Sequence, residues 1–279
     1  MPTYETDGPI SVALDFEIGS VWIRASKRAD VVVDVRPTSA ARDADIKAAE
    51  LTQVDFSGGR LTLKGPKQRT VFSSRKGSIE ITVELPVGSE VHAESPMSDF
   101  VTEGPLGDCR IKTSMGRIQL DRAENARIKT DMGDIRLGTA AGNAEVTGSG
   151  RIEVGTVGGR LTVKNSNGDT EIDEVRGELT ANSSNGRIHV GSAEAGVEAR
   201  TANGPVRLGR IVRGKVNLQA GVGDVEVGIA EGTAAWLDVH SKFGAVRNEL
   251  GPAQGPGDAR ETVEVRATTQ VGSITVRRA

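Results

Sequence analysis

The chain alternates apolar and polar residues in short segments, and each of these segments begins just after a glycine. Between residues 109 and 227 the pattern occurs seven times, and successive glycines are 17 to 19 residues apart. With the glycine as position zero, positions +2 and +4 are apolar and position +3 is polar, which indicates a strand with one buried face. The glycines are Gly116, Gly133, Gly150, Gly168, Gly186, Gly204 and Gly223.

A second apolar pair precedes the glycine at positions −7 and −5, as in Leu161 and Val163, and a third apolar position follows at about +7, as in Val157. Two units depart in part: the one at Gly150 fits with a one-residue deletion, and the one at Gly168 has Thr170 at position +2. Two strands and an inward corner in each unit describe one turn of a solenoid. We therefore predict an all-β fold, a single-chain parallel β-solenoid (β-helix-like) with turns of 17–19 residues. Adjacent turns would stack ~4.8 Å apart.

The pattern continues with less fidelity toward both ends, so we expect residues 1–279 to form one solenoid domain with its core repeats at 91–248. Residues 25–69 interrupt the early turns, and we interpret them as an N-terminal cap. Within them, 40–51 predicts a short helix, and 54–56 with 61–63 predicts a hairpin. Phe72, Ile79 and Ile81 around Gly77 predict another turn. A Gly/Pro-rich loop at 249–261 would precede a closing turn at 262–279.

Composition is consistent with a narrow stacked coil rather than a bulky core. Aromatic residues make up 3% of the chain, glycines number 35, and the formal net charge is −3. The single cysteine cannot form an internal disulfide, and the polar, acidic N-terminus lacks the features of a secretory signal. No apolar run is long enough to span a membrane. We therefore expect a cytoplasmic location.

Stacking in register would place equivalent positions in columns along the solenoid. Position +1 alternates basic and acidic residues, which predicts a ladder of exposed ion pairs, and position −1 carries asparagines whose amides could hydrogen-bond up the column. An asparagine before glycine is equally consistent with a simple turn role. The ladder residues are Arg117, Asp134, Arg151, Asp169, Arg187 and Asp224, together with Asn167, Asn185 and Asn203.

Position −4 forms the most function-like column, a mildly basic stripe that predicts an anion-binding or partner-binding strip. An ordinary solvated face is the alternative interpretation. Interleaved aromatic residues, which single-stranded nucleic-acid binders use for base stacking, are absent from it. The basic members of this stripe are Lys112, Lys129, Lys164 and Arg200.

The residue patterns that are typical of catalytic or metal-binding sites are not evident in the sequence. His92, His189 and His240 fall at different repeat positions, so they do not suggest a metal site. Cys109 occupies an inward position and is best explained as a small buried hydrophobe. Acidic residues in the +1 column alternate with arginines, which disfavours the clustered carboxylates of a polysaccharide-cleaving β-helix. We predict no catalytic residues, no metal and no cofactor.

Several strings resemble the repeats of a known family. They are TSMGRIQL (113–120), TDMGDIRL (130–137), NSNGDTEI (165–172) and SSNGRIHV (183–190). They are similar to the β-strand repeats of the bacterial "putative adhesin" family, domain of unknown function 4097, also called Toastrack. Residues 243–250 and 263–279 resemble the way actinobacterial members end. The resemblance implies a β-solenoid that serves as a binding or sensory scaffold. Many relatives are joined to membrane segments and linked to cell-envelope stress systems.

Our leading hypothesis is a non-enzymatic interaction module that binds another protein, with a transporter or regulator as one class of partner. The second hypothesis is a carbohydrate-active or polysaccharide-binding β-helix. The third is electrostatic binding of nucleic acid along the basic stripe, which the acidic net charge disfavours. We expect either a monomer or an end-to-end homodimer.

Overall fold

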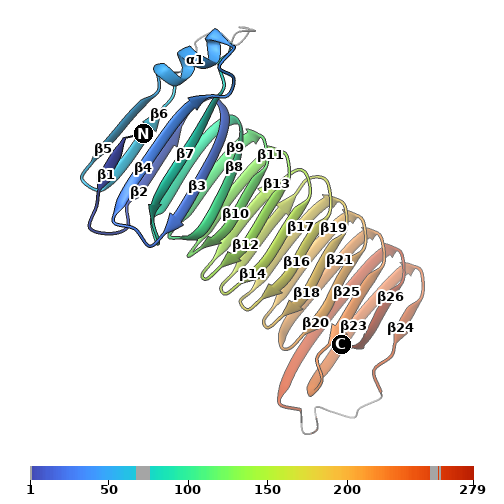
Figure 1. The fold of residues 1–279 in the computed structure, drawn as a ribbon. Helices are drawn as coiled ribbons and strands as arrows, with labels where there is room; N and C mark the ends of the chain where they lie inside the picture. Colours follow the sequence, from blue (N-terminus) through green and yellow to red (C-terminus); the bar gives the residue numbers. More distant parts are fainter. Residues whose placement is uncertain (1, 67–75, 252–256, 258) are drawn as a thin grey trace. The chain divides into compact units, whose positions relative to one another are not determined.

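The structure is a computed structural model that describes residues 2–66, 76–251, 257 and 259–279 (Figure 1). It forms two compact units, Met1–Thr139 and Ala140–Ala279, each of which is described here by itself. Parallel strands dominate both units, and the described residues contain one short helix. The predicted all-β parallel solenoid is therefore confirmed, while the organisation as one domain stays a prediction.

The second unit repeats two strands per turn, and each strand pairs in parallel with its equivalent one turn away. For example, Leu161 lies opposite Leu179, which in turn lies opposite Val197. These strands are β13 (Ala144–Gly148), β14 (Ile152–Val157), β15 (Leu161–Asn165), β16 (Thr170–Val175), β17 (Leu179–Asn185), β18 (Ile188–Ala193), β19 (Val197–Asn203), β20 (Val206–Ile211), β21 (Gly214–Val222) and β22 (Val225–Ile229).

The core of this unit lies inside the turns and contains small and β-branched side chains. Leu161 and Val163 on one face, and Ile188 and Val190 on another, are at most 1% exposed. The third corner is also buried, because Val157, Val175, Ala193 and Ile211 are completely enclosed. All three sets of inward positions inferred from the alternation are thus confirmed.

The repeated glycine is required by a close approach between turns. Gly204 has a φ of +139°, a region that other residues avoid, and a Cβ placed on it would lie 2.2 Å from the carbonyl oxygen of Gly186. Gly223 makes the same approach to Gly204, and Gly272 makes it to Gly223. A side chain at these positions would push apart the backbones of neighbouring turns.

The spatial order of the last turns differs from their order in the sequence. Strands β25 (Glu261–Val271) and β26 (Ile274–Arg278) pair with β21 and β22 on one side, and with β23 (Thr233–Phe243) and β24 (Val246–Asn248) on the other. The expected closing turn at 262–279 is therefore inserted before the turn at 233–248, which is outermost. Part of the predicted Gly/Pro loop, residues 252–256 and 258, lies outside the described residues.

The first unit has the same construction, and its N-terminal strands also stack out of sequence order. Strands β2 and β3 pair with β6 and β7 on one side and with the long strand β8 on the other. The turns then continue in sequence order toward β12. The strands are β2 (Ser11–Asp15), β3 (Ile18–Ser26), β6 (Arg60–Lys64), β7 (Ile79–Pro86), β8 (Glu90–Leu106), β9 (Cys109–Met115), β10 (Ile118–Ala123), β11 (Ala126–Met132) and β12 (Ile135–Ala140). Phe72, which was assigned to a turn with Ile79, lies outside the described residues.

Antiparallel elements cap this end of the first unit. The predicted hairpin is β5 (Gln53–Ser57) with β6, and the predicted helix is α1 (Asp43–Glu50), so both are confirmed. Two strands were not predicted from the sequence, β1 (Thr3–Glu5) and β4 (Asp30–Pro37). They pair with each other, and β4 also covers the edge of β7. The buried Asp45 accepts hydrogen bonds from the backbone N–H groups of Ser39 and Ser78, at 3.2 and 2.9 Å. These bonds connect the helix to the segments that precede it and that lead into β7.

Candidate functional site

A groove of about 600 Å³ crosses the outward face of five neighbouring strands in the second unit. In spatial order these strands are β17, β19, β21, β25 and β23. Their outward side chains present amides, hydroxyls and cations to the groove. The polar side chains that line the groove include Asn182, Arg200, Gln219, His240, Lys242 and Gln270.

The groove is bordered by an exposed apolar ridge, which we define as Val222, Val271 and Phe243. These residues directly follow the groove residues Gly221, Gln270 and Lys242 in the sequence, and the register places them side by side. They are 52%, 47% and 64% exposed, respectively. The ammonium group of Lys242 lies 5.5 Å from the centre of the Phe243 ring, a cation–π contact. The site therefore combines an apolar edge with a polar, weakly cationic floor.

The basic stripe inferred from the sequence is divided between the two units. Lys112 and Lys129 are neighbours on β9 and β11, whereas Lys164 and Arg200 lie on β15 and β19 with Asn182 between them. Gln219 and His240 also occupy position −4, four residues before Gly223 and Gly244. They are not adjacent in the stack, because the inserted β25 places Thr268 between them.

Carboxylates accompany most of the stripe's cations. Lys112 forms an ion pair with Glu94, and this contact outweighs partial desolvation and holds the pKa of the carboxyl below its ordinary value. The Lys129 ammonium group lies 3.3 Å from the Asp131 carboxylate, and the Arg200 guanidinium group lies 2.7 Å from the Glu198 carboxylate. Since opposite charges adjoin these cations, the stripe offers little net positive field for a polyanion.

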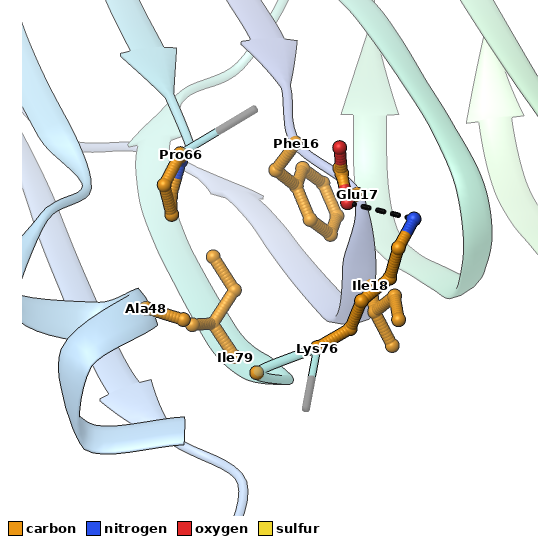
Figure 2. A pocket seen from close by; sticks show the side chains of 8 residues that line it. Phe16, Glu17, Ile18, Ala48, Pro66, Lys76 and Ile79 are labelled. Carbon is orange, nitrogen blue, oxygen red and sulfur yellow. Dashed lines mark ion pairs between the residues drawn. The ribbon is translucent and has the colours of Figure 1, made fainter. Parts of the chain in front are cut away.

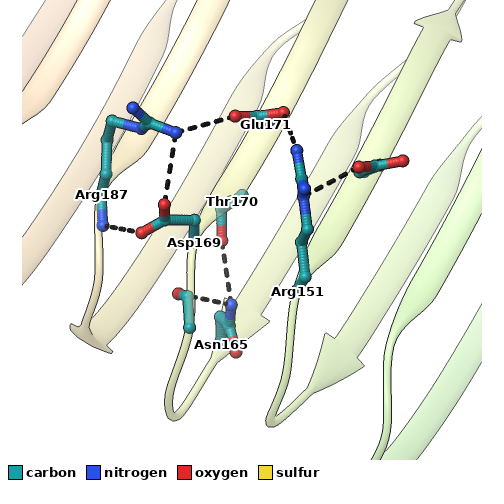
Figure 3. A network of polar contacts seen from close by, with 8 residues as sticks. Arg151, Asn165, Asp169, Thr170, Glu171 and Arg187 are labelled. Atoms are coloured by element: carbon teal, nitrogen blue, oxygen red, sulfur yellow. Dashed lines mark hydrogen bonds and ion pairs between the residues drawn. The ribbon is translucent and has the colours of Figure 1, made fainter.

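The +1 column forms a network with the neighbouring +3 column (Figure 3). The Arg187 guanidinium lies 3.2 Å from Asp169 and 2.8 Å from Glu171. Arg151 reaches Glu171 at 2.9 Å and Glu153 at 2.8 Å. The hydrogen bond from Arg151 is the main reason why the pKa of Glu171 is lowered. These two glutamates stack directly on each other. They were not part of the predicted ladder, because that prediction concerned the +1 column alone.

Aspartates at position +1 have a second role that the sequence interpretation missed. The backbone N–H of Arg187 donates to the Asp169 carboxylate at 2.9 Å, and the backbone N–H of Ser273 donates to Asp224 at 2.7 Å. In the first unit Arg117 donates in the same way to Asp99 at 2.7 Å. The backbone carbonyl of Asp134 accepts a hydrogen bond from the N–H of Ile118. These carboxylates satisfy turn amides and therefore hold the register of the stack.

The asparagine column is made of two different arrangements. The Asn203 amide donates to the side-chain oxygen of Asn185 at 2.9 Å, whereas the backbone N–H of Asn167 lies 3.3 Å from the side-chain oxygen of Asn165. Asn165 is buried, and its amide donates to the carbonyls of Gly150 and Gly168. It also donates to the hydroxyl of Thr170 (Figure 3). The signal for Asn165 is an amide at an inward position, where the two adjacent turns have Gly148 and Ser183.

The surroundings of Glu226 predict how the unfolding free energy depends on pH. Burial raises its pKa, but hydrogen bonds from Arg277 at 2.9 Å and Arg207 at 2.6 Å outweigh burial and leave the pKa below the ordinary 4.5. A lowered carboxyl pKa stabilises the folded state above the ordinary value, and this stabilisation is lost as pH falls through the folded-state value. We expect Glu226→Gln to lower the unfolding free energy at pH 7 by roughly 1 kcal/mol and to flatten its decline below pH 4.5.

Chemical denaturation between pH 3 and pH 7 measures this effect, with the exposed Glu231→Gln as the matched control. The control should follow the parent protein at every pH. Parallel acid profiles for the parent and Glu226→Gln would show that the two arginines contribute nothing through Glu226.

A second exposed apolar row lies in the first unit and was not recognised in the sequence. Met97, Met115 and Met132 occupy the position just before the turn in adjacent strands, and the register places them next to one another. They are 44%, 44% and 60% exposed. We call this set the methionine row. The signal was present in the sequence, since the residue before the turn glycine is methionine at both Gly116 and Gly133.

The described residues contain no group of three or more His, Cys, Asp or Glu side chains that could hold a metal ion. Cys109 is 3% exposed, and burial is the largest cause that raises the pKa of its thiol to about 12. It is therefore a protonated, unreactive side chain at neutral pH. Across the described part of the chain, no helix has the length and apolarity needed to cross a membrane.

A small cavity of about 10 Å³ lies between the helix and the first strands (Figure 2). Phe16, Ala48 and Ile79 line it, and an ion pair of 3.0 Å between Glu17 and Lys76 borders it. This volume holds about one water molecule. The cavity is therefore a packing defect beneath the cap rather than a ligand site.

Stacked turns, paired surface charges and an open groove are the features of a solenoid scaffold, a class in which each turn packs on its neighbours and the outer faces are available for binding. The family model described as Toastrack DUF4097 matches residues 11–277. The chain therefore belongs to the Toastrack family.

Solved structures with a similar fold share little sequence with this chain. One is described as a "putative adhesin" from Parabacteroides merdae, with 15% identity, coverage of 100% of this chain and 95% of that chain, and a TM-score of 0.39. Another, with the same description, is from Bacteroides fragilis, with 14% identity, coverage of 99% and 95%, and a TM-score of 0.36. No curated protein matches the chain.

Proposed function

We propose that this chain is a non-enzymatic scaffold that binds a protein partner in the groove of the second unit. The carrying observation is the apolar ridge of Val222, Val271 and Phe243 beside a polar floor. Exposed apolar side chains gathered in one place, with polar groups around them, are typical of protein-binding surfaces. The ridge would bury apolar side chains of the partner, while the floor would satisfy its backbone and carboxylate groups.

The partner chemistry follows from the groove. The ammonium group of Lys242 and the imidazole of His240 can donate to acidic groups, and the amides of Asn182 and Gln219 can both donate and accept hydrogen bonds. An extended acidic segment with interspersed apolar residues fits this lining. We further propose that this segment belongs to a transporter or regulator of the cell envelope, and that the chain binds it in the cytoplasm, where the lone buried Cys109 needs no disulfide partner.

The test compares affinity capture from cell extract by the parent chain and by a Val271→Ser/Phe243→Ser variant. Leu51→Ser is the matched control, because Leu51 is 63% exposed but lies directly after α1 in the first unit. We expect one or more proteins to be captured by the parent and the control and lost from the ridge variant. Cross-linking mass spectrometry should then place the captured chain on the groove strands.

Equal capture by all three proteins, or cross-links confined to other faces, would overturn the proposal. Circular dichroism should be identical for the three proteins, so that loss of capture is not loss of fold.

A second candidate is binding of a polysaccharide, favoured by the amides of Asn182, Gln219 and Gln270, which can hydrogen-bond to sugar hydroxyls. Affinity electrophoresis in gels containing xylan or a soluble glucan tests it. Retardation of the parent chain that is lost in Gln219→Ala would favour the polysaccharide, and unchanged mobility in both gels would exclude these two polymers.

A further inference from the structure

The outermost turn of the second unit exposes one long edge of the sheet. Among the described residues β23 pairs with β25 only, so its other edge has no strand partner. Its inward side chains are only half-buried at Leu237 and Val239, whereas their neighbours Val265 and Ala267 in β25 are completely buried. The difference arises because no described strand stacks on β23 from the outside.

Such an edge is a ready template for pairing with another strand, and soluble proteins usually protect it. In the first unit, antiparallel β4 and β5 cover the corresponding end, and α1 packs beside them. β23 has none of this protection and contains no proline. Trp236 is 55% exposed on its outward face, and Phe243 at its end is 64% exposed. These features indicate an edge that a partner strand covers.

We propose that the partner is a second copy of the same chain, whose β23 pairs antiparallel with this β23 about a two-fold axis at Val239. In an antiparallel pair, directly opposite side chains lie on the same face. Asp238 would then lie opposite His240 of the second copy, and Trp236 opposite Lys242. An acidic group would meet an imidazole, and an aromatic ring would meet an ammonium group, twice each by symmetry.

The strand's own sequence selects this register over its neighbours. Full overlap of the two strands would centre on Asp238 and place two carboxylates directly opposite each other, which is destabilising. A centre at Val239 keeps residues 235–243 of each copy paired and removes that repulsion. A centre at His240 would leave only 237–243 paired. Val239 is therefore the centre with the longest overlap that opposes unlike groups.

The pairing also explains why inward side chains of β23 remain apolar at a surface. Val239 would contact Val239 of the second copy, and Leu237 would lie beside Ser241. Because the two-fold axis is perpendicular to the sheet, both outward faces stay on one side of the joined sheet. His240 and Lys242, which line the groove, would then bring the two grooves together at the interface.

Sedimentation velocity of the full chain at increasing concentration tests the association. We expect a species of twice the 29.3 kDa monomer mass and its loss in Val239→Lys, which places two lysines face to face. Gln53→Lys, which introduces the same side chain on the exposed edge of β5 at the capped end of the first unit, should leave the dimer intact. A monomeric parent chain, a dimer that survives Val239→Lys, or a dimer that dissociates in Gln53→Lys would overturn the proposal.

Two pairs of further variants test the register of the strand pairing. Asp238→Lys should weaken the dimer at least tenfold, and Asp238→Lys/His240→Asp should restore it, because the exchanged charges again face each other. Val239→Cys should form an intermolecular disulfide under mild oxidation, whereas Leu237→Cys should not. Cross-linking through Leu237→Cys alone, or no rescue by the double exchange, would contradict pairing about Val239. None of these measurements depends on the partner proposed for the groove.

Discussion

Replacing Ile135 by Asp is expected to destabilise the chain severely. Ile135 is 1% exposed at an inward position of β12, and the narrow core offers a carboxylate no room to reach water. The loss of apolar burial and the cost of an enclosed charge together should exceed about 4 kcal/mol. Guanidinium denaturation followed by circular dichroism should show a large fall in the midpoint, or an unfolded protein at the outset.

Arg136→Asp is the matched control, because it introduces the same carboxylate one residue later on an exposed face. The cost should stay within about 1 kcal/mol, the usual range for surface charges. Similar midpoints for Ile135→Asp and the parent protein would show that position 135 does not face the core.

Ending the chain at Arg260 is expected to unfold two turns rather than one. Removal of β25 and β26 takes away the strand partners that β23 and β24 have among the described residues. Residues 233–248 should therefore lose their backbone protection together with the deleted segment, and the inward side chains of β21 and β22 should become exposed. Hydrogen exchange measured by mass spectrometry should show fast exchange throughout 233–248 and slower exchange in β17 and β19.

A chain ending at Val276 provides the control, since it removes the Arg277–Glu226 ion pair but keeps most of the inserted turn. Its exchange pattern should resemble that of the full chain. Persistent protection of 233–248 in the chain ending at Arg260 would mean that β23 can stack directly on β21, as the sequence order alone would suggest.

The repeat period predicted the turns and the core because each inward position is set by the alternation within its own segment. Leu161, Ile188 and Val157 could be assigned to the interior without knowledge of any neighbouring turn. The order of the turns could not be assigned in this way. The strand that contains Val265 and Ala267 has the same apolar–polar pattern as its neighbours. The repeat period therefore permits this strand to form the outermost turn or to stack between two earlier turns.

The candidate site depends on that order, which explains why only part of it could be predicted. Arg200 was placed on an outward column from its repeat position alone. Thr268 and Gln270 enter the groove because β25 is inserted between β21 and β23, and no local feature indicates this. β4 was missed for a related reason, because its run of valines falls in a segment without the glycine period.

The first unit stacks its N-terminal strands out of sequence order, and this order also affects synthesis of the chain. β2 and β3 leave the ribosome early, yet they pair with β6, β7 and β8, which are translated later. At about 5–20 residues per second, this delay is several seconds. During that interval the earliest strands have no solenoid to join, and their apolar faces are available to chaperones or to neighbouring nascent chains.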